Sequence, residues 1–352
     1  MQSAQFGWAV LGPGAIAVTF VAALRAVPGA RLRAVWGRDA GRAQAFALRH
    51  GLHARCAAAE LDAVLDDPQV HAVYVATTHD AHAGLAARAL AAGKPVLCEK
   101  PLTLCEADTR ELCALSRAHR VFLMEGLWTR MLPLYRALGS RLAQAGLGEL
   151  RSVTSNFCFV VPYEARSRLF DPARGGGALL DIGVYNVAMT RWAVHSAGGV
   201  AEAVVARSLD SLCAPDGVDI ANVGSLRFAG GTVAQFVCAF DRIATNGLQL
   251  HGTRGSVWVP QDFWAGQRAE WIAADGSRES LHMPHAVNGF EYQIEEAMRC
   301  IREGRIESPG MPHAESVAVA REIDALRALA TAGGRRLDAR PSAAAAATPH
   351  SA

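Results

Sequence analysis

The sequence predicts an α/β protein in which a parallel sheet with covering helices is followed by an α+β region with an open, mostly antiparallel sheet. The chain has 352 residues, and a single hydrophobic core stops growing near roughly 250–300 residues. The first third alternates apolar runs with amphipathic stretches. Beyond residue 150, candidate strands follow one another between glycine-rich turns. We therefore predict domains over 1–125 and 126–332 and a disordered tail over 333–352.

Short apolar runs in the first third have the length and the Val content of β-strands. The helical patterns between them require parallel strands, because each helix carries the chain back across the sheet. Glycines follow two of these patterns, where helices commonly end. The predicted strands are Trp8–Leu11, Leu32–Trp36, His71–Ala76, Pro95–Cys98 and Val121–Met124, and the helices are Ile16–Ala26, Gly41–His50 and Asp80–Ala92, with Gly51 and Gly93 after the last two.

The second region has the pattern of an antiparallel sheet interrupted by one helix and closed by two more. Turn signals such as Ala229–Gly231 separate the strands. The predicted strands are Arg151–Val160, Val200–Ser208, Ile220–Phe228, Thr232–Phe240, Gly247–Gly252 and Gly255–Val259, and the helices are Leu179–His195, Phe290–Glu303 and His313–Ala330.

Charge and hydropathy exclude several classes of partner. The formal net charge is +2 and the arginines are scattered, so we expect no nucleic acid and no anionic membrane as partners. No apolar stretch is long enough to span a bilayer, and the N-terminus lacks the pattern of a signal peptide. Eight cysteines without a C-x-x-C pair fit reduced side chains. We expect a cytoplasmic protein.

The segment Gly12-Pro13-Gly14-Ala15-Ile16-Ala17 fits G-x-G-x-x-A between a predicted strand and a predicted helix. The first glycine allows a tight turn, and the second lets the backbone approach a pyrophosphate, which the helix N-terminus attracts. This context predicts a Rossmann dinucleotide-binding domain, with contacts from Gly12, Pro13, Gly14, Ala15 and Ile16.

The end of the second strand favours NADP over NAD. An NAD enzyme commonly places an acidic residue there for the ribose 2′-hydroxyl, whereas this chain has Gly37 and Arg38. A guanidinium pairs with a 2′-phosphate and a carboxylate repels it. Asp39, one residue later, keeps NAD as the alternative cofactor, because its carboxylate either reaches the ribose or only caps the next helix.

Three further motifs carry a resemblance to a known family. They are Glu99-Lys100-Pro101 at the end of a predicted strand, Trp128-Thr129-Arg130, and Asp181-Ile182-Gly183-Val184-Tyr185. Together with the glycine loop they resemble the glucose–fructose oxidoreductase / inositol dehydrogenase (Gfo/Idh/MocA) family. The Trp-Thr-Arg segment and the tyrosine are similar to the branch that holds dimeric dihydrodiol dehydrogenase and D-xylose 1-dehydrogenase. The resemblance implies a cofactor between two domains and a homodimer or homotetramer formed through the C-terminal sheet.

The resemblance also implies that Lys100, Asp181 and Tyr185 form the catalytic set. Asp181 precedes Tyr185 by four residues, so a helix places both on one face. Hydride transfer needs a proton moved to or from the substrate oxygen. Tyr185 offers a phenol, and the Lys100 ammonium is expected to lower the pKa of that phenol. The choice of acid–base between Lys100 and Tyr185 stays open.

Further contacts are expected around these motifs. We predict no metal site, because His79 and His82 have no apparent third ligand. Predicted cofactor contacts, besides the glycine loop, are Gly37, Arg38, Thr77, Thr78, His79, His82, Glu99, Lys100 and Arg130, and predicted substrate contacts are Trp128, Phe157, Asp181 and Tyr185.

These observations predict an NAD(P)-dependent dehydrogenase or reductase that acts on a CH–OH group. The expected substrate is a small sugar or cyclic diol, with an aldose such as D-xylose and a trans-dihydrodiol as the two closest analogies. The alternative is a non-catalytic regulator that retains nucleotide or sugar binding. Such a protein is expected to lose Lys100 or its helix partners, which this chain keeps.

Overall fold

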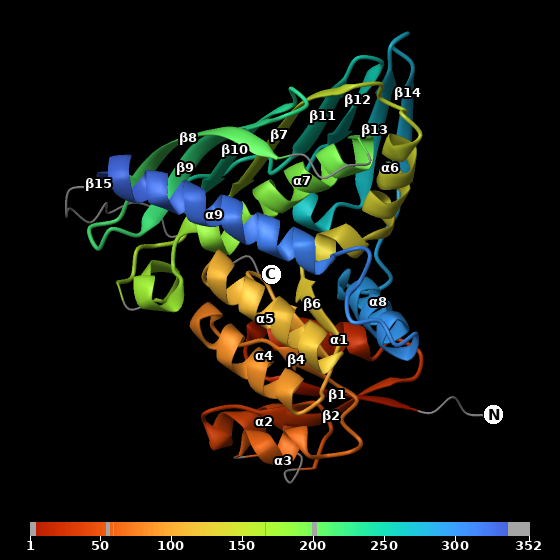
Figure 1. The fold of residues 1–352 in the computed structure, drawn as a ribbon, viewed down its shortest axis with the longest axis vertical. Helices are drawn as coiled ribbons and strands as arrows, with labels where there is room; N and C mark the ends of the chain where they lie inside the picture. Colours follow the sequence, from red (N-terminus) through yellow and green to blue (C-terminus); the bar gives the residue numbers. More distant parts are fainter. Residues whose placement is uncertain (1–4, 54–56, 59, 166, 199–202, 337–352) are drawn as a thin grey trace.

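The computed structural model describes residues 5–53, 57–58, 60–165, 167–198 and 203–336. The described residues form a six-stranded sheet in the order β3-β2-β1-β4-β5-β6 and a nine-stranded sheet in the order β14-β13-β12-β11-β7-β10-β9-β8-β15. Figure 1 shows the first sheet at the bottom of the molecule and the second at the top, with helices between them. The predicted fold class is confirmed.

The N-terminal sheet is parallel throughout. The strand order reverses at β1, because the chain continues from β1 to β2 and β3 on one side and to β4, β5 and β6 on the other. In sheets of this kind, ligands bind beyond the carboxyl ends of the strands at the point of reversal. The strands are β1 (Phe6–Leu11), β2 (Ala30–Trp36), β3 (Ala57–Ala58), β4 (Ala72–Val75), β5 (Val96–Glu99) and β6 (Leu123–Gly126), and the helices are α1 (Ala15–Leu24), α2 (Ala40–Arg49), α3 (Leu61–Leu65), α4 (His82–Ala91) and α5 (Glu106–His119).

Burial explains why the central strands of this sheet read as continuous apolar runs. Every residue of β1, β4 and β5 is buried, because helices cover both faces of a parallel sheet. The predicted ends of α2 and α4 also hold: Gly51 has φ +81° and Gly93 has φ +73°, the left-handed conformation that glycine adopts without strain.

The C-terminal sheet is mostly antiparallel, with two exceptions. β7 and β10 pair in parallel near its centre, and β15 pairs in parallel with β8 at one edge. The strands are β7 (Leu150–Cys158), β8 (Val204–Cys213), β9 (Asp219–Phe228), β10 (Val233–Ala239), β11 (Leu248–Gly252), β12 (Gly255–Val259), β13 (Arg268–Ala273), β14 (Arg278–His282) and β15 (Arg335–Arg336).

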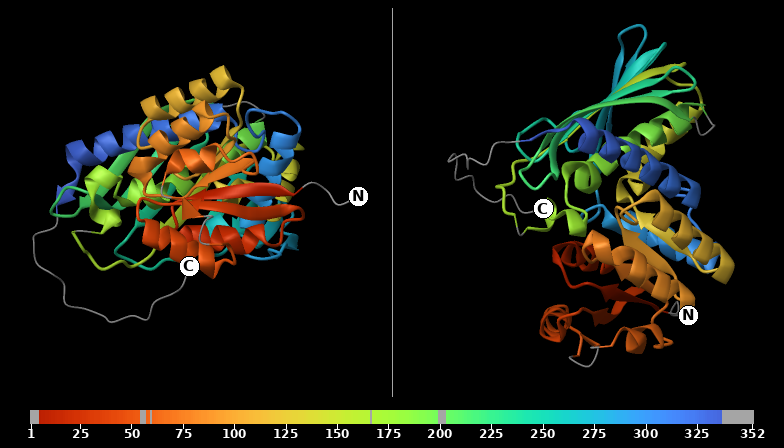
Figure 2. Two further views of the ribbon diagram at one scale, coloured as in Figure 1. Left: turned by 90° about the horizontal axis from the view of Figure 1, so that it is seen from below. Right: turned by 60° about the vertical axis from the view of Figure 1, so that its left-hand side comes forward.

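Helices lie between the two sheets and connect them. The helices of the second region are α6 (Pro133–Ala143), α7 (Val184–Gly198), α8 (Phe290–Arg302) and α9 (His313–Gly333). α7 and α9 lie on the face of the nine-stranded sheet that looks toward the N-terminal region, and the views of Figures 1 and 2 agree on this placement. α9 also packs on α5, and α8 packs on α1. The two regions therefore share one continuous core.

Several predicted boundaries differ from the structure. β13 and β14 were not predicted: β14 is an edge strand with polar residues on both faces, and most residues of β13 are only partly buried, so neither strand shows a clear two-residue period. The predicted strand Val200–Ser208 corresponds to β8, which begins at Val204, and residues 200–202 lie outside the described residues. The tail was predicted to begin at Gly333, but α9 includes Gly333 and Arg335–Arg336 form β15. Residues 337–352 lie outside the described residues.

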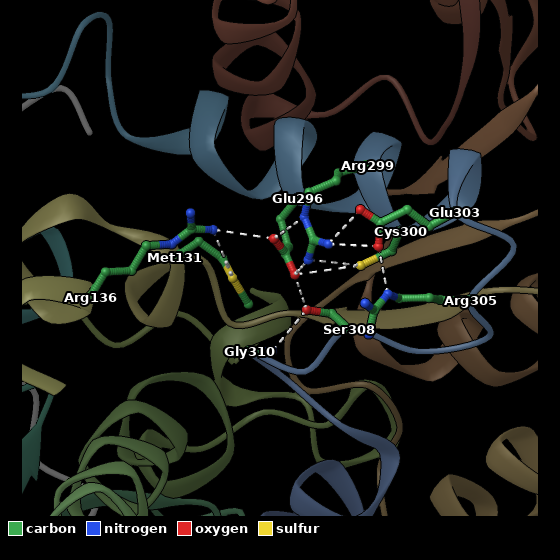
Figure 3. Close-up of polar contacts among 9 residues, drawn as sticks. All are labelled: Met131, Arg136, Glu296, Arg299, Cys300, Glu303, Arg305, Ser308 and Gly310. Atoms are coloured by element: carbon green, nitrogen blue, oxygen red, sulfur yellow. Dashed lines mark hydrogen bonds and ion pairs between the residues drawn. The ribbon is translucent and has the colours of Figure 1, made fainter. Parts of the chain in front are cut away.

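A buried carboxylate, Glu296 on α8, ties the last part of the chain to the rest (Figure 3). Its Oε1 accepts hydrogen bonds from Ser308 Oγ at 2.6 Å and Arg299 Nη2 at 2.8 Å, and its Oε2 pairs with Arg136 of α6 at 3.3 Å. Ser308 Oγ also accepts from the backbone N–H of Gly310 at 3.0 Å. The cluster fixes the segment before α9 against α6 and α8.

Candidate active site

A cleft of about 840 Å³ opens where the two regions meet. Its walls include the segments that follow β1, β2, β4 and β5, at the point where the strand order reverses. The second region contributes Arg168, Asp181 and Tyr185. The predicted contacts that line this cleft are Gly12, Pro13, Gly14, Ala15, Ile16, Gly37, Arg38, Thr77, Thr78, His79, His82, Glu99, Lys100, Asp181 and Tyr185.

The glycine loop has a geometry that fits a pyrophosphate. Gly12 has φ +106°, and a Cβ there would lie 2.7 Å from the carbonyl oxygen of Ala76, so only glycine fits the turn. A Cβ at Gly14 would meet only that same oxygen, at 3.7 Å, which leaves the backbone open toward the cleft. No side chain caps the N-terminus of α1, and its first turn contains no acidic residue. Its N–H groups therefore remain available to an anion.

The end of β2 fits the phosphate that distinguishes NADP. A Cβ at Gly37 would lie 2.8 Å from Pro13 Cδ, so the glycine lets β2 pass close to the loop. Arg38 and Arg42 both line the cleft. Among the residues that the structure describes, neither guanidinium has a hydrogen bond or an ion pair. Asp39 accepts the backbone N–H of Arg42 at 3.0 Å and so caps α2, the structural one of its two predicted roles.

Lys100 and Asp181 meet across the boundary between the two regions. Lys100 follows the last residue of β5, and its peptide bond to Pro101 is cis. Its Nζ donates to the backbone oxygen of Asp181 at 2.5 Å and lies 3.4 Å from the Asp181 Oδ1. Both side chains are largely buried, with exposed fractions of 14% and 7%. Residues 81 positions apart in the chain thus form one pair.

A π-helical turn presents Asp181, and α7 continues from it to Tyr185. The turn covers Leu179–Gly183, where the sequence predicted an α-helix. Both side chains nevertheless face the cleft. The buried carboxylate of Asp219 accepts the backbone N–H of Leu179 at 2.7 Å and holds the start of the turn. π-turns inside helices occur frequently at functional sites.

The side chains of Lys100, Arg168 and His79 surround the Asp181 carboxylate in the cleft. Burial acts to raise the pKa of Asp181, but the Lys100 ammonium and the Arg168 guanidinium outweigh it and lower that pKa well below its ordinary value. Arg168 Nη1 lies 3.1 Å from the Asp181 Oδ1. Burial and the nearby Lys100 lower the pKa of His79 to about 3. His79 is therefore neutral at pH 7, and its Nδ1 lies 3.1 Å from the carbonyl oxygen of Gly175.

Burial also shifts the pKa of two neighbours of Lys100, Glu99 and Tyr185. Burial raises the pKa of Glu99 to about 7, although the Tyr74 hydroxyl donates to its Oε1 at 2.6 Å. Burial and the negative charge of Glu99 raise the pKa of Tyr185 well above 10. The expected lowering of this pKa by Lys100 does not prevail, because the net shift is upward. The ammonium lies over the phenol ring, 5.3 Å from its centre.

Three predicted contacts do not line the cleft. Arg130, predicted to bind the cofactor, is buried and pairs with Glu315 of α9 at 3.2 Å. Trp128, predicted to contact substrate, donates its indole N–H to the Tyr185 hydroxyl at 3.0 Å. Phe157, also predicted to contact substrate, stacks on Trp264 with ring centres 3.6 Å apart. Each of these three side chains thus has a partner that lies far away in the sequence.

Three cations that line the cleft, Arg42, Arg88 and Arg168, were not predicted from the sequence. Arg42 follows Arg38 by four residues near the start of α2, so the position just inside that predicted helix was a usable signal. Arg168 lies in a segment of short helical turns between β7 and α7, where no periodicity identifies it. Within the described residues, no cluster of three or more His, Cys, Asp or Glu side chains could hold a metal ion.

The fold and the cleft define a two-domain NAD(P)-dependent oxidoreductase that acts on a CH–OH group of a small molecule. The oxidoreductase family with an NAD-binding Rossmann fold matches residues 6–127. The GFO/IDH/MocA C-terminal domain matches residues 135–258. The chain belongs to the GFO/IDH/MocA oxidoreductase family, as its motifs predicted.

Curated relatives and solved structures agree with this membership. The chain is 33% identical to rabbit (Oryctolagus cuniculus) trans-1,2-dihydrobenzene-1,2-diol dehydrogenase over 90% of its own length and 96% of that protein. The human (Homo sapiens) enzyme is 32% identical over 91% and 95%. A 3-ketoreductase from Actinomadura kijaniata, solved with NADP, is 27% identical with a TM-score of 0.79, covering 95% of this chain and 99% of that chain. These relatives favour an enzyme over a non-catalytic regulator.

Proposed function

We propose that this enzyme oxidises a carbinol of a small sugar or cyclic diol with NADP, or reduces the matching carbonyl. The observation that carries the proposal is the convergence of Lys100, Asp181 and Tyr185 in the cleft that the glycine loop, Arg38 and Arg42 also line. The substrate class is suggested by the dihydrodiol dehydrogenases, which are similar over nine-tenths of the chain. Structures of the similar ketoreductase include variants with a lysine changed to alanine and a tyrosine changed to phenylalanine.

The glycine loop and the end of β2 would hold the cofactor. The N–H groups of α1 would face the pyrophosphate, and Arg38 and Arg42 the 2′-phosphate, because two unpaired guanidiniums suit a dianion. Thr77, Thr78, His79, His82 and Glu99 would line the nicotinamide end. When bound, the cofactor supplies or accepts the hydride at nicotinamide C4.

Lys100, Asp181 and Tyr185 would bind and polarise the reacting oxygen. A phenol whose pKa lies well above 10 stays protonated at neutral pH, so Tyr185 suits a hydrogen-bond donor and general acid toward a carbonyl oxygen. The ammonium of Lys100 stabilises negative charge on that oxygen. Asp181 orients the ammonium through its carboxylate and its backbone oxygen.

The test is the absorbance of reduced nicotinamide with purified protein, NADP or NAD, and a panel of aldoses, inositols and trans-diols. Reduction of NADP by one substrate class supports the proposal. Nucleotide binding without turnover of any member, in either direction, would contradict the proposed substrate class and revive the regulator hypothesis.

We also propose a homodimer or homotetramer formed through the C-terminal sheet. Support comes from apolar side chains on strands of that sheet that remain exposed, namely Val205, Val223, Val233 and Trp258. Light scattering after size exclusion tests this proposal, and a monomer at micromolar concentration would refute it.

We propose a cytoplasmic location as well. The described cysteines are free thiols, which suits a reducing compartment. Among the helices of the described residues, none combines the length and apolar character needed to cross a bilayer. Fractionation of cells that express a tagged chain tests the location, and recovery outside the cytoplasmic fraction would refute it.

A further inference from the structure

The hydroxyl of Tyr185 has one hydrogen-bond partner among the residues that the structure describes, the indole of Trp128 at 3.0 Å. An indole nitrogen can only donate a hydrogen bond, whereas a phenol oxygen can donate and accept. The direction of this bond is therefore fixed by chemistry: Trp128 donates and Tyr185 accepts. The phenolic hydrogen therefore does not point at the indole nitrogen and is free for another acceptor, and Tyr185 lines the cleft in which a substrate oxygen would lie.

The surroundings hold the indole in one place. Trp128 is 7% exposed and packs on Phe290 at the start of α8, with ring centres 4.9 Å apart. The residue before Phe290 is Gly289, which has φ +96°. A Cβ at Gly289 would lie 2.5 Å from Trp128 Cζ3. The indole therefore lies directly against the backbone where α8 begins, and any side chain there would displace it.

The same bond bears on the proton transfer itself. When Tyr185 gives its hydrogen to a substrate oxygen, negative charge develops on the phenol oxygen in a site that is 6% exposed. A buried charge is costly without a hydrogen-bond donor. The indole N–H is already aimed at that oxygen, so it stabilises the charged form without any rearrangement.

We propose that Trp128 is a positioning residue for this reaction: its indole N–H holds the Tyr185 hydroxyl as an acceptor, directs the phenolic hydrogen into the cleft, and stabilises the charge that develops when that hydrogen is transferred. The proposal rests on the proposed role of Tyr185 as the hydrogen donor. The expectation that Trp128 contacts the substrate is a separate prediction.

The test is Trp128→Phe, which keeps an aromatic ring against Phe290 and removes the N–H. We expect kcat to fall about 10- to 100-fold, as for loss of a hydrogen bond to a charged group. The Kd for NADP and the KM for substrate should change by less than about threefold. The pH at which the Tyr185-dependent limb of kcat titrates should rise.

The matched control is Trp264→Phe. Trp264 stacks on Phe157 close to Tyr185, but its indole donates no hydrogen bond to the phenol. This control should leave kcat and the pH profile within about threefold and a few tenths of a unit of wild type, as for a contact that does not change in the transition state. Equal effects of the two changes would overturn the proposal.

A double-variant cycle separates positioning from general structural damage. In a Tyr185→Phe background, Trp128→Phe should cause no further loss of kcat, because the acceptor is gone. A further loss of similar size would overturn the proposal. If Tyr185→Phe itself keeps wild-type kcat, the proposed role of Tyr185 fails instead.

A measurement that leaves Trp128 unchanged covers the case in which Trp128→Phe does not fold. The chain has seven tryptophans, so ¹⁵N-tryptophan labelling gives a small set of indole N–H signals. Tyr185→Phe should move one indole proton strongly upfield and speed its exchange with solvent. A spectrum in which no indole signal responds would overturn the proposal.

Discussion

Replacing Lys100 by methionine tests the proposed chemistry most directly. Lys100 Nζ lies 3.4 Å from the Asp181 Oδ1 and donates to the Asp181 backbone oxygen. Methionine keeps most of the side-chain volume and removes the charge and the donor. Arg168 remains 3.1 Å from the same carboxylate oxygen. Asp181 is therefore not left as an unpaired buried charge, and we expect a stability loss of about 1–3 kcal/mol rather than about 3–5 kcal/mol.

The effect on turnover should be much larger. A positioned acid–base or charge-stabilising group contributes about 10²- to 10⁴-fold, or about 3–5 kcal/mol of barrier. Lys100 is not among the residues proposed to hold the pyrophosphate or the 2′-phosphate, so the Kd for NADP should change by less than about tenfold, or 1.4 kcal/mol. Absorbance of reduced nicotinamide measures kcat, and a fluorescence titration measures the Kd.

The composition of the chain supplies a second test of Lys100. Lys94 and Lys100 are its only lysines, beside 33 arginines. Lys94 Nζ donates to the carbonyl oxygens of Asp67 and Val70, away from the cleft. Acetylation followed by peptide mass spectrometry should show activity lost in step with Lys100 modification, and NADP should protect Lys100 only. A Lys100→Met enzyme within about threefold of the wild-type kcat, or activity that follows Lys94 instead, would refute the reasoning.

Three further predictions concern the cofactor and stability. Arg38→Ala should lower kcat/KM with NADP by about 10- to 100-fold and change it little with NAD, and equal losses with both cofactors would contradict a phosphate contact. Burial raises the pKa of Asp219 from 3.8 to about 6, so the folded state binds its proton more tightly than the unfolded chain and stability falls as pH rises through this window. Asp219→Asn should remove about 3 kcal/mol of that pH dependence in urea unfolding between pH 4 and 7, and an unchanged slope would exclude this carboxyl as its source. Glu296→Gln should cost about 1–3 kcal/mol in the same assay, with exposed Glu295→Gln as a control within about 0.5 kcal/mol; similar losses would show that the cluster around Glu296 contributes nothing.

The first region was predicted well because its signals are local. The glycine loop, the strand before it and the helix after it are adjacent in sequence, and each depends on the residues beside it. The second region was predicted less completely. The edge strand β14 carries polar residues on both faces, and its neighbour β13 is only partly buried along most of its length. The two-residue alternation of burial that identifies β9 and β10 is therefore weak in these strands.

The candidate site was predicted unevenly for the same reason. Lys100 at the end of β5 and Asp181 four residues before Tyr185 follow from local position and spacing. The partners of Arg130 and Trp128 could not be predicted locally, since Glu315 and Tyr185 lie 185 and 57 residues further along the chain. A buried arginine or indole takes whichever acceptor packing brings near, because leaving its N–H groups unpaired is costly.

By itself, the sequence determined the two-part α/β architecture, the glycine loop and the strand end that places Lys100 in the cleft. Apolar periodicity and glycine conformation specify these features over a few residues. Tertiary structure alone decided that the Asp181 carboxylate contacts both Lys100 and Arg168, and that the Trp128 indole donates to the Tyr185 hydroxyl. Such pairs depend on how sheets and helices pack across long stretches of chain, and the hydrogen-bond direction and charge balance of the site follow from that packing.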